Sequence, residues 1–163
     1  MSNGTKIPRE QAEAAGARVL EAIDGYVSRA MICGSIRRGV DMVHDCDIVA
    51  VAHGEVEAAG AMQTLENMGE KIRGGKKLMS ARVDGVQVDL WLVPEESWGA
   101  ATMFATGSPQ VNIRQRQIAT RNGLVLNQYG LWRGKECIAS RTEQEVYAAL
   151  GMPYLEPWER SLG

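Results

Sequence analysis

Two aspartates immediately precede a continuously apolar segment, and this segment limits the possible folds of the chain more than any other part of the sequence. Asp45 and Asp47 are separated by one residue and lead into residues 48–52. A strand without polar alternation is typical of a covered sheet, so this segment predicts a sheet with helices packed on it. Strand side chains alternate with a period of two, so both carboxylates project from one face. Carboxylates this close repel each other, and a divalent cation such as Mg²⁺ offsets that repulsion.

A turn rich in glycine, serine and arginine precedes the two aspartates. It contains Gly34, Ser35, Arg37, Arg38 and Gly39. Its backbone N–H groups, its hydroxyl group and its guanidinium groups together suit a phosphate chain. Arg37 is interpreted equally well as a structural ion-pair residue. A metal site and a polyphosphate site near the end of one strand indicate nucleotidyl transfer.

A third carboxylate lies in a later strand-like segment. Asp84-Gly85 is a strong two-residue hairpin signal between the apolar segments 78–83 and 86–93. Alternation within the second segment places Asp89 on the face opposite Val88 and Leu90. Alternation alone favours a solvent-facing carboxylate here over a functional one, because half-buried strands expose polar residues on one face.

Apolar periodicity and turn residues predict the other elements. Pro8 begins an amphipathic helix that we expect to end near Ser28, and Thr142 with Glu145 forms a capping box for a last helix. Residues 71–77 are expected to form a basic loop. Further helices are expected at 55–68, 95–104 and 109–122, and strands at 30–33, 47–52, 78–83, 86–93, 124–126 and 131–132. Strands and helices arranged in blocks predict an α+β fold.

The composition indicates a globular chain of one or two small subdomains. The chain has 163 residues, of which 45% are hydrophobic. No apolar run approaches the roughly 20 residues of a membrane span, and residues 1–6 lack the apolar core of a signal peptide. We therefore expect a cytoplasmic protein that makes no membrane contact. Cys33, Cys46 and Cys137 match no common zinc spacing and are expected to be buried thiols rather than a disulfide framework.

Charge is distributed unevenly along the chain. The net charge of −2 argues weakly against nucleic-acid binding, because proteins that bind a duplex through many phosphates usually carry a clear excess of basic residues. Residues 97–135 nevertheless contain no acidic residue, and they include the five cations Arg114, Arg116, Arg121, Arg133 and Lys135. A second basic cluster comprises Lys71, Arg73, Lys76 and Lys77. Both clusters are consistent with phosphate binding and equally with solvated surface.

Taken in order, the motifs resemble those of the family X, or beta-type, DNA polymerases, which belong to the nucleotidyltransferase superfamily. The resemblance rests on the turn at 34–39, Asp45-x-Asp47, Val88-Asp89-Leu90, 104–108, Asn112 with Arg116, 126–131 and the tail at 141–154. It implies an α+β fold in which a nucleotidyltransferase palm, a mixed sheet with helices packed on it, occupies residues 1–94. It also implies that a small α+β thumb, which selects the nucleotide, occupies residues 95–163.

The same resemblance implies a set of site residues. Asp45, Asp47 and Asp89 would be the catalytic residues and would bind two Mg²⁺ ions, with Mn²⁺ as a substitute. Residues expected to contact the incoming nucleotide are Gly34, Ser35, Arg38, His44, Phe104, Thr106, Gly107 and Asn112. Residues expected to contact the template or other DNA are Arg116, Lys76 and Lys77.

The implied activity is that of a template-directed DNA polymerase. Such an enzyme adds dNMP from a dNTP to a primer 3′ hydroxyl, here by gap or end filling of the DNA repair type, on primer-template or gapped DNA. The alternative is a nucleotidyltransferase that works without a template, or on RNA or a small molecule. Family members usually carry a lyase domain and a helix-hairpin-helix region before the palm, bacterial members often add a C-terminal phosphoesterase, and none of these matches these residues. We therefore expect no lyase or exonuclease activity, and a protein partner is one means of supplying DNA binding.

Three positions depart from the family pattern. His44 stands where relatives usually have glycine, so its side chain must point away from the triphosphate or add a donor. A soft-metal site at His44 and Cys46 is less favoured than a packing or surface role, because further ligands are absent. Ala105 replaces a phenylalanine and Trp91 replaces an arginine, two groups that take part in moving the thumb of relatives. Their replacement predicts a simpler closing step and looser nucleotide selection.

Overall fold

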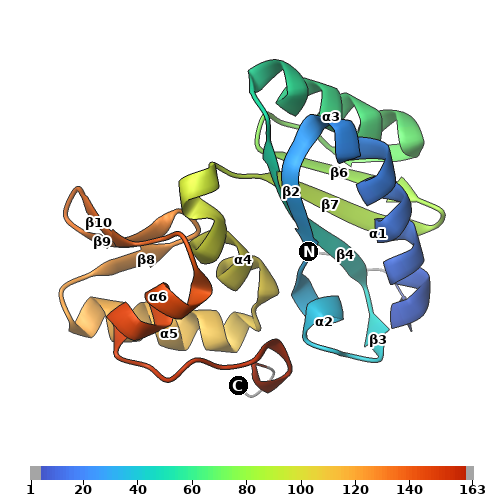
Figure 1. Ribbon diagram of the computed structural model, residues 1–163. Helices are drawn as coiled ribbons and strands as arrows, with labels where there is room; N and C mark the ends of the chain where they lie inside the picture. The colour runs from blue at the N-terminus through green and yellow to red at the C-terminus, as the bar shows by residue number, and fades with distance from the viewer. Residues whose placement is uncertain (1–4, 161–163) are drawn as a thin grey trace. The chain divides into compact units, whose positions relative to one another are not determined.

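The computed structural model describes residues 5–160, which form two compact units divided between Val93 and Pro94 (Figure 1). The N-terminal unit is built on a five-stranded sheet with the strand order β2-β4-β7-β6-β5. These strands are β2 (Val27–Ile32), β4 (Asp45–Ala52), β5 (Glu70–Arg73), β6 (Leu78–Val83) and β7 (Val86–Leu92). β4 and β7 run parallel and the other neighbours run antiparallel, so the sheet is mixed.

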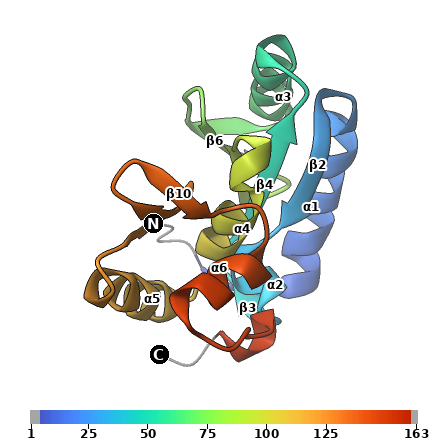
Figure 2. The same cartoon turned by 60° about the vertical axis from the view of Figure 1, so that its left-hand side comes forward.

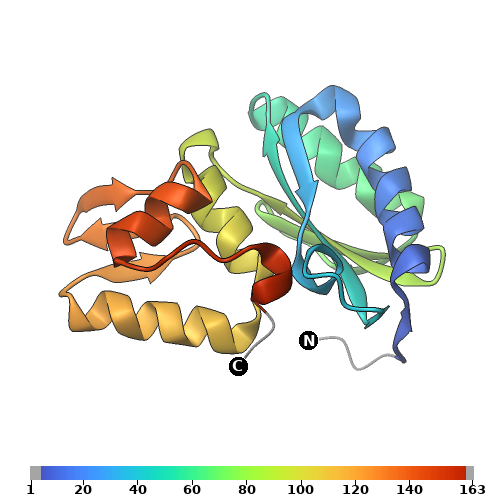
Figure 3. The same ribbon diagram turned by 60° about the horizontal axis from the view of Figure 1, so that its bottom comes forward.

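Two helices, α1 (Arg9–Ile23) and α3 (Glu55–Met68), cover one face of this sheet (Figures 1 and 3). Each helix buries a stripe of residues spaced by three or four positions, as an amphipathic helix does. At Gly16 of α1 an added Cβ would lie 2.6 Å from the Cys46 Sγ of β4, so glycine permits the close approach of helix and strand. The buried stripes comprise Ala12, Ala15, Val19 and Ile23 on α1, and Ala61, Met62 and Leu65 on α3.

Short elements complete the N-terminal unit. The 3-10 helix η1 (Asp24–Tyr26) joins α1 to β2, and a single helical turn, α2 (Gly34–Arg37), follows β2. β1 (Ile7–Pro8) pairs antiparallel with β3 (Met42–Val43), so the start of α1 lies next to the segment that leads into β4. Arg9 strengthens this junction, because its Nη1 donates to the Gly39 carbonyl oxygen at 2.6 Å.

The C-terminal unit packs three helices against a three-stranded antiparallel sheet of order β10-β9-β8 (Figures 2 and 3). Met103, Ala119, Leu131, Val146 and Leu150 contribute to its core, which is separate from that of the first unit. Its elements are η2 (Glu95–Ser97), α4 (Trp98–Thr106), α5 (Pro109–Arg121), β8 (Val125–Asn127), β9 (Gly130–Arg133), β10 (Glu136–Ala139), α6 (Glu143–Leu150) and η3 (Pro157–Glu159).

Local sequence signals set the ends of α5 and α6. Ser108 caps α5, because its side chain accepts a hydrogen bond from the Val111 N–H, and Pro109 occupies the first helical position. Thr142 and Glu145 form the expected capping box of α6. Gly151 ends α6 in the left-handed conformation, with φ of 74°.

The α+β fold is the one predicted, but several local details differ from expectation. The first helix ends at Ile23, and Val27 belongs to β2. Residues 34–37 form a helical turn, the basic segment contains the strand β5, and a further strand, β10, follows β9. Among residues 5–160, no helix is long and apolar enough to cross a membrane. Cys33 and Cys46 are buried thiols as expected, whereas the expectation of burial was wrong for Cys137, which is exposed on β10.

Candidate active site

The three aspartates meet where β4 and β7 run side by side. Asp47 is paired in register with Asp89, and Asp45 is paired with Gln87. The intervening Cys46 and Val88 point into the core beneath the helices, so the carboxylates occupy the opposite face of the sheet. The structure thus brings together three carboxylates from two strands that are separated in sequence by α3, β5 and β6.

Crowding raises the pKa of two of these carboxyl groups. The pKa of Asp47 is raised well above its usual range, first by burial and then by the charges of Asp45 and Asp89. The pKa of Asp45 is also raised, by burial and by Asp89, while His44 acts in the opposite direction. The indole of Trp91 lies near Asp47 and favours its charged form, without completing a hydrogen bond of standard geometry. The site therefore concentrates negative charge that a cation would relieve.

The predicted phosphate-binding turn packs against the same carboxylate. Gly34 has φ of +64°, and a Cβ added there would lie 2.4 Å from the Asp47 Oδ2. The Cys33 N–H donates to the Asp47 carbonyl oxygen at 2.7 Å, which fixes the turn to β4. Burial lowers the pKa of the Arg38 guanidinium, and Asp47 opposes that shift. Gly34 and Ser35 lie on α2 and Arg38 directly follows it, and of these Gly34 and Arg38 lie close to Asp47.

A buried glutamine that sequence analysis missed holds the third carboxylate. The Gln87 Nε2 donates to the Asp89 Oδ1 at 3.0 Å, and both side chains are buried. This bond fixes the orientation of Asp89 on β7. The signal for it was present in the sequence, because alternation places Gln87 two residues before Asp89 on the same face.

The donor set fits a hard divalent cation. In residues 5–160, no group of three or more His, Cys, Asp or Glu side chains is already arranged as a metal-binding cluster. The carboxylates of Asp45, Asp47 and Asp89 nevertheless supply only oxygen donors, and the raised pKa of Asp47 shows that their charges are mutually unfavourable. Oxygen-only ligands and excess negative charge suit Mg²⁺ or Mn²⁺ better than a soft metal.

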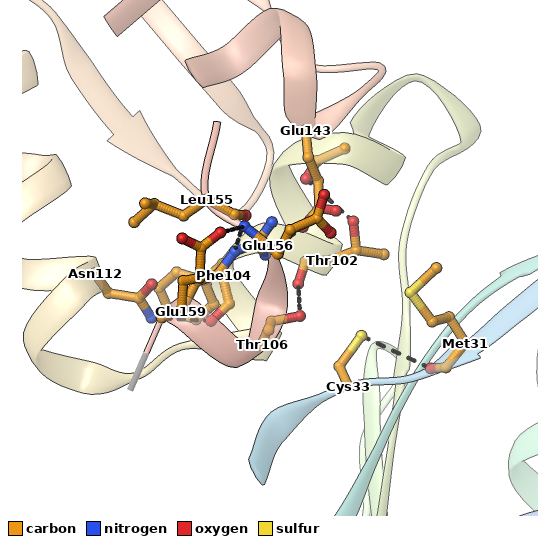
Figure 4. Close-up of polar contacts among 12 residues, drawn as sticks. Met31, Cys33, Thr102, Phe104, Thr106, Asn112, Glu143, Leu155, Glu156 and Glu159 are labelled. Carbon is orange, nitrogen blue, oxygen red and sulfur yellow. Dashed lines mark hydrogen bonds and ion pairs between the residues drawn. The ribbon is translucent and has the colours of Figure 1, made fainter. Parts of the chain in front are cut away.

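Other predicted site residues meet in the C-terminal unit. Phe104, Asn112 and Arg116 line one small pocket, and the Asn112 Nδ2 donates to the Phe104 carbonyl oxygen at 2.9 Å (Figure 4). The spacing of four residues between Asn112 and Arg116 is thus realised as a shared face of α5. Leu126 and Asn127, from the motif at 126–131, also line this pocket, together with three residues that sequence analysis did not single out: Ala100, Met103 and Gln115.

The turn between α4 and α5 is tightly held. The Thr106 Oγ1 donates to the Thr102 carbonyl oxygen at 2.6 Å, and Thr106 is fully buried (Figure 4). Gly107 adopts φ of +73°, a conformation that glycine tolerates better than other residues. Thr106 and the neighbouring Gly107 are both buried, so the turn between the two helices is closely packed.

The remaining predicted positions lie on the surface. Lys76 and Lys77 are exposed in the loop between β5 and β6, and His44 is exposed just before β4. His44 still influences the site, because it opposes the rise in the pKa of Asp45. The predicted residues fall into two sets, one in each unit.

The comparisons with known proteins agree on one family. Residues 101–161 match the family model of the DNA polymerase beta thumb. The chain is 30% identical to the DNA polymerase/3′-5′ exonuclease PolX of Bacillus subtilis, over 80% of this chain and 24% of that protein. It is 26% identical to human DNA nucleotidylexotransferase, over 95% of this chain and 40% of that protein.

A solved structure extends the likeness to almost the whole chain. A ternary primer/template complex of Leishmania infantum polymerase beta superimposes with a TM-score of 0.82 at 25% identity, covering 98% of this chain and 78% of that one. The chain spans less than half the length of the curated relatives named above. Together these likenesses support a family X DNA polymerase.

Proposed function

We propose that this chain is the catalytic part of a DNA polymerase that adds dNMP from a dNTP to a primer 3′ hydroxyl under the direction of a template. In this proposal residues 1–94 act as the palm and residues 95–163 as the thumb. The observation that carries the proposal is the register of β4 and β7, which sets Asp47 beside Asp89 with Asp45 two residues away. Family X polymerases generally use divalent metals.

Each residue has a role that its surroundings support. Asp45, Asp47 and Asp89 would hold two Mg²⁺ ions, which stabilise charge on the attacking and leaving oxygens of a phosphoryl transfer. Asp89, whose carboxylate accepts a hydrogen bond from Gln87, would accept the proton of the primer hydroxyl. The Gly34 and Ser35 turn and the Arg38 guanidinium would bind the triphosphate, because they lie beside the carboxylate cluster.

The C-terminal unit would read the nascent base pair. Thr106 and Gly107 would contact the sugar of the incoming nucleotide through their backbone, and Phe104 and Asn112 its base. Arg116, on the same face of α5 as Asn112, would contact the template. Exposed Lys76 and Lys77 would contact DNA phosphates at a distance from the chemistry.

Primer extension with the Asp89→Asn variant tests this function. On a gapped duplex with dNTPs and Mg²⁺, we expect incorporation to fall at least about a thousandfold, which corresponds to roughly 4 kcal/mol. The matched control is Asp84→Asn, which changes the hairpin aspartate that pairs with Arg18 outside the site. Wild-type levels of incorporation by Asp89→Asn would refute the mechanism.

A second candidate is the addition of nucleotides without a template. The similarity to DNA nucleotidylexotransferases of several vertebrates favours it. The same assay on single-stranded primers separates the two activities. Arg116→Ala should reduce templated extension at least about tenfold more than single-strand extension, because only templated extension needs a contact with the template. Equal losses on both substrates would favour the second candidate.

A further inference from the structure

A fully buried arginine, Arg160, follows η3 in the C-terminal unit. Arg160 has 0% of its surface exposed, and its Nη1 donates to the Glu143 Oε1 at 2.7 Å. Its Nε donates to the Leu155 carbonyl oxygen at 2.9 Å (Figure 4 labels Glu143 and Leu155). The guanidinium carbon also lies 5.3 Å from the ring centroids of both Tyr147 and Tyr154. Two hydrogen bonds and two aromatic rings therefore fix this side chain.

Stability alone does not explain such an arrangement. A buried ion pair loses the hydration of both charges, and apolar residues of similar volume are often as stabilising. What the pair supplies is a single defined geometry, because a guanidinium must meet its carboxylate partner in a fixed orientation. The pair of Arg160 and Glu143 ties the segment after α6 to the first turn of α6.

The backbone of the same residue holds the turn between α4 and α5. The Arg160 carbonyl oxygen accepts a hydrogen bond from the Ser108 N–H at 3.0 Å. Ser108 in turn caps α5 through the Val111 N–H, and its carbonyl oxygen accepts the Asn112 N–H at 2.9 Å. A continuous series of bonds thus links the Glu143 carboxylate to the N-terminus of α5.

We propose that Arg160, locked by Glu143, is a positioning residue that sets the turn at residues 106–108 and the start of α5 for nucleotide binding. The inference rests on the proposed function of Thr106, Gly107 and Asn112. Arg160 acts through Ser108 and touches no reacting atom. A turn that shifts by an ångström would misplace the sugar and base of the nucleotide, and misplacement on that scale can cost about a hundredfold in rate.

The test uses the full chain and four variants. Arg160→Met and Glu143→Leu each leave one charge without its partner, whereas the double variant Glu143→Leu/Arg160→Met replaces the whole pair with apolar groups. The double variant guards against a simple failure to fold, because it leaves no uncompensated buried charge. Leu150→Ala is the matched control, since it removes a buried side chain of the same core without touching Ser108.

Four quantities are measured for each variant: the melting temperature, the hydrogen-exchange rate of the Ser108 amide, and the KM and kcat for a dNTP in gap filling. In the double variant we expect faster Ser108 exchange and a KM raised about tenfold, with kcat changed much less, because an interaction shared by ground and transition states is weakened. Leu150→Ala should lower the melting temperature and leave KM unchanged.

Two outcomes would overturn the proposal. One is a double variant with wild-type KM and wild-type Ser108 protection, which would make the pair a replaceable part of the core. The other is a rise in KM for Leu150→Ala equal to that of the double variant, which would mean that the effect comes from lost stability. Failure of the proposed function is distinguishable from both, because an inactive wild-type protein would reveal it, while Ser108 exchange would still decide whether Arg160 positions the turn.

Discussion

The hydrogen bond from Gln87 to Asp89 gives a prediction at the scale of one residue. Replacing Gln87 by leucine keeps a buried side chain of similar size but removes the donor to Asp89. Loss of a bond that orients a metal-binding carboxylate typically costs 10- to 100-fold, so we expect Gln87→Leu to lower kcat by about that factor. Primer extension under saturating dNTP measures the change.

The chain contains a matched control for this variant. The Gln63 Nε2 donates to the Asn67 Oδ1 at 3.0 Å, a bond of the same kind and length on the exposed side of α3. Gln63→Leu should leave kcat unchanged. If Gln87→Leu also retained full activity, Asp89 would be held adequately by its own strand.

The repulsion around Asp47 predicts that the site is destabilising in the absence of metal. Asp47→Asn removes the charge that burial, Asp45 and Asp89 make unfavourable. We expect the variant to gain about 1–2 kcal/mol in free energy of unfolding when metal is removed by a chelator. Excess Mg²⁺ should stabilise the wild-type protein and have little effect on the variant, because binding to the folded state alone raises stability.

Thermal unfolding with chelator and with Mg²⁺ measures both effects. Asp24→Asn, at an exposed position of η1, serves as the control and should show the wild-type response to Mg²⁺. A metal-free Asp47→Asn protein less stable than wild type would show that the carboxylate is held by favourable contacts.

At the scale of an element, the start of α6 depends on one carboxylate. The Glu145 Oε2 accepts the backbone N–H groups of Arg141, Ser140 and Thr142, at 2.6, 3.2 and 3.4 Å. These bonds, led by the one from Arg141, hold the pKa of Glu145 below its ordinary value of 4.5. A carboxyl group with a lower pKa in the folded state stabilises the protein above its unfolded-state pKa and ceases to do so as the pH falls.

Glu145→Gln should therefore reduce stability at neutral pH and matter less in acid. We expect a loss of about 1 kcal/mol at neutral pH, the typical value of a helix cap. The difference from wild type should shrink as the pH falls below 4.5 and through the lower pKa of the folded state. Denaturant unfolding across this range measures it, with the exposed Glu136→Gln as control. A difference in free energy of unfolding between wild type and variant that stays constant with pH would exclude the charge of Glu145 as its cause.

Elements with complete local signals were predictable from the sequence. The helix at 55–68 and the hairpin around Asp84-Gly85 have the expected bounds, apart from a strand end at Leu92. The strand β5 was missed because it lies at the sheet edge with every side chain exposed, so it shows no apolar alternation. The first helix was drawn too long because its apolar period continues to Val27, after the chain has already left α1.

The candidate site was predictable only in part, for a physical reason. Period-two alternation places Asp45 and Asp47 on one face, but nothing local states that β7 pairs with β4 across the intervening elements. That pairing, which sets Asp89 beside Asp47, is a long-range property of the sheet. Nothing in the sequence indicated that Arg160 is buried, because arginine is ordinarily exposed and only tertiary packing buries this one.

At the scale of the molecule, each unit has its own core, and this predicts that the C-terminal unit folds alone. A fragment of residues 94–163 retains the core, the caps of α5 and α6, and the buried pair of Arg160 and Glu143. We expect a dispersed NMR spectrum and cooperative but modest stability, because a domain this small buries a limited share of its surface. Leu131→Ala should unfold the fragment, and a collapsed wild-type spectrum would contradict the prediction.

The placement of the three cysteines should allow a thiol-reactive dye to label a single position. Cys33 and Cys46 are enclosed in the N-terminal unit, and burial raises the pKa of the Cys46 thiol, which makes it a poor nucleophile. Cys137 alone is exposed, on β10 of the C-terminal unit. A maleimide dye should therefore attach at one position of the unmodified protein. The fluorescence of that dye would report on the C-terminal unit as nucleotide or DNA is added.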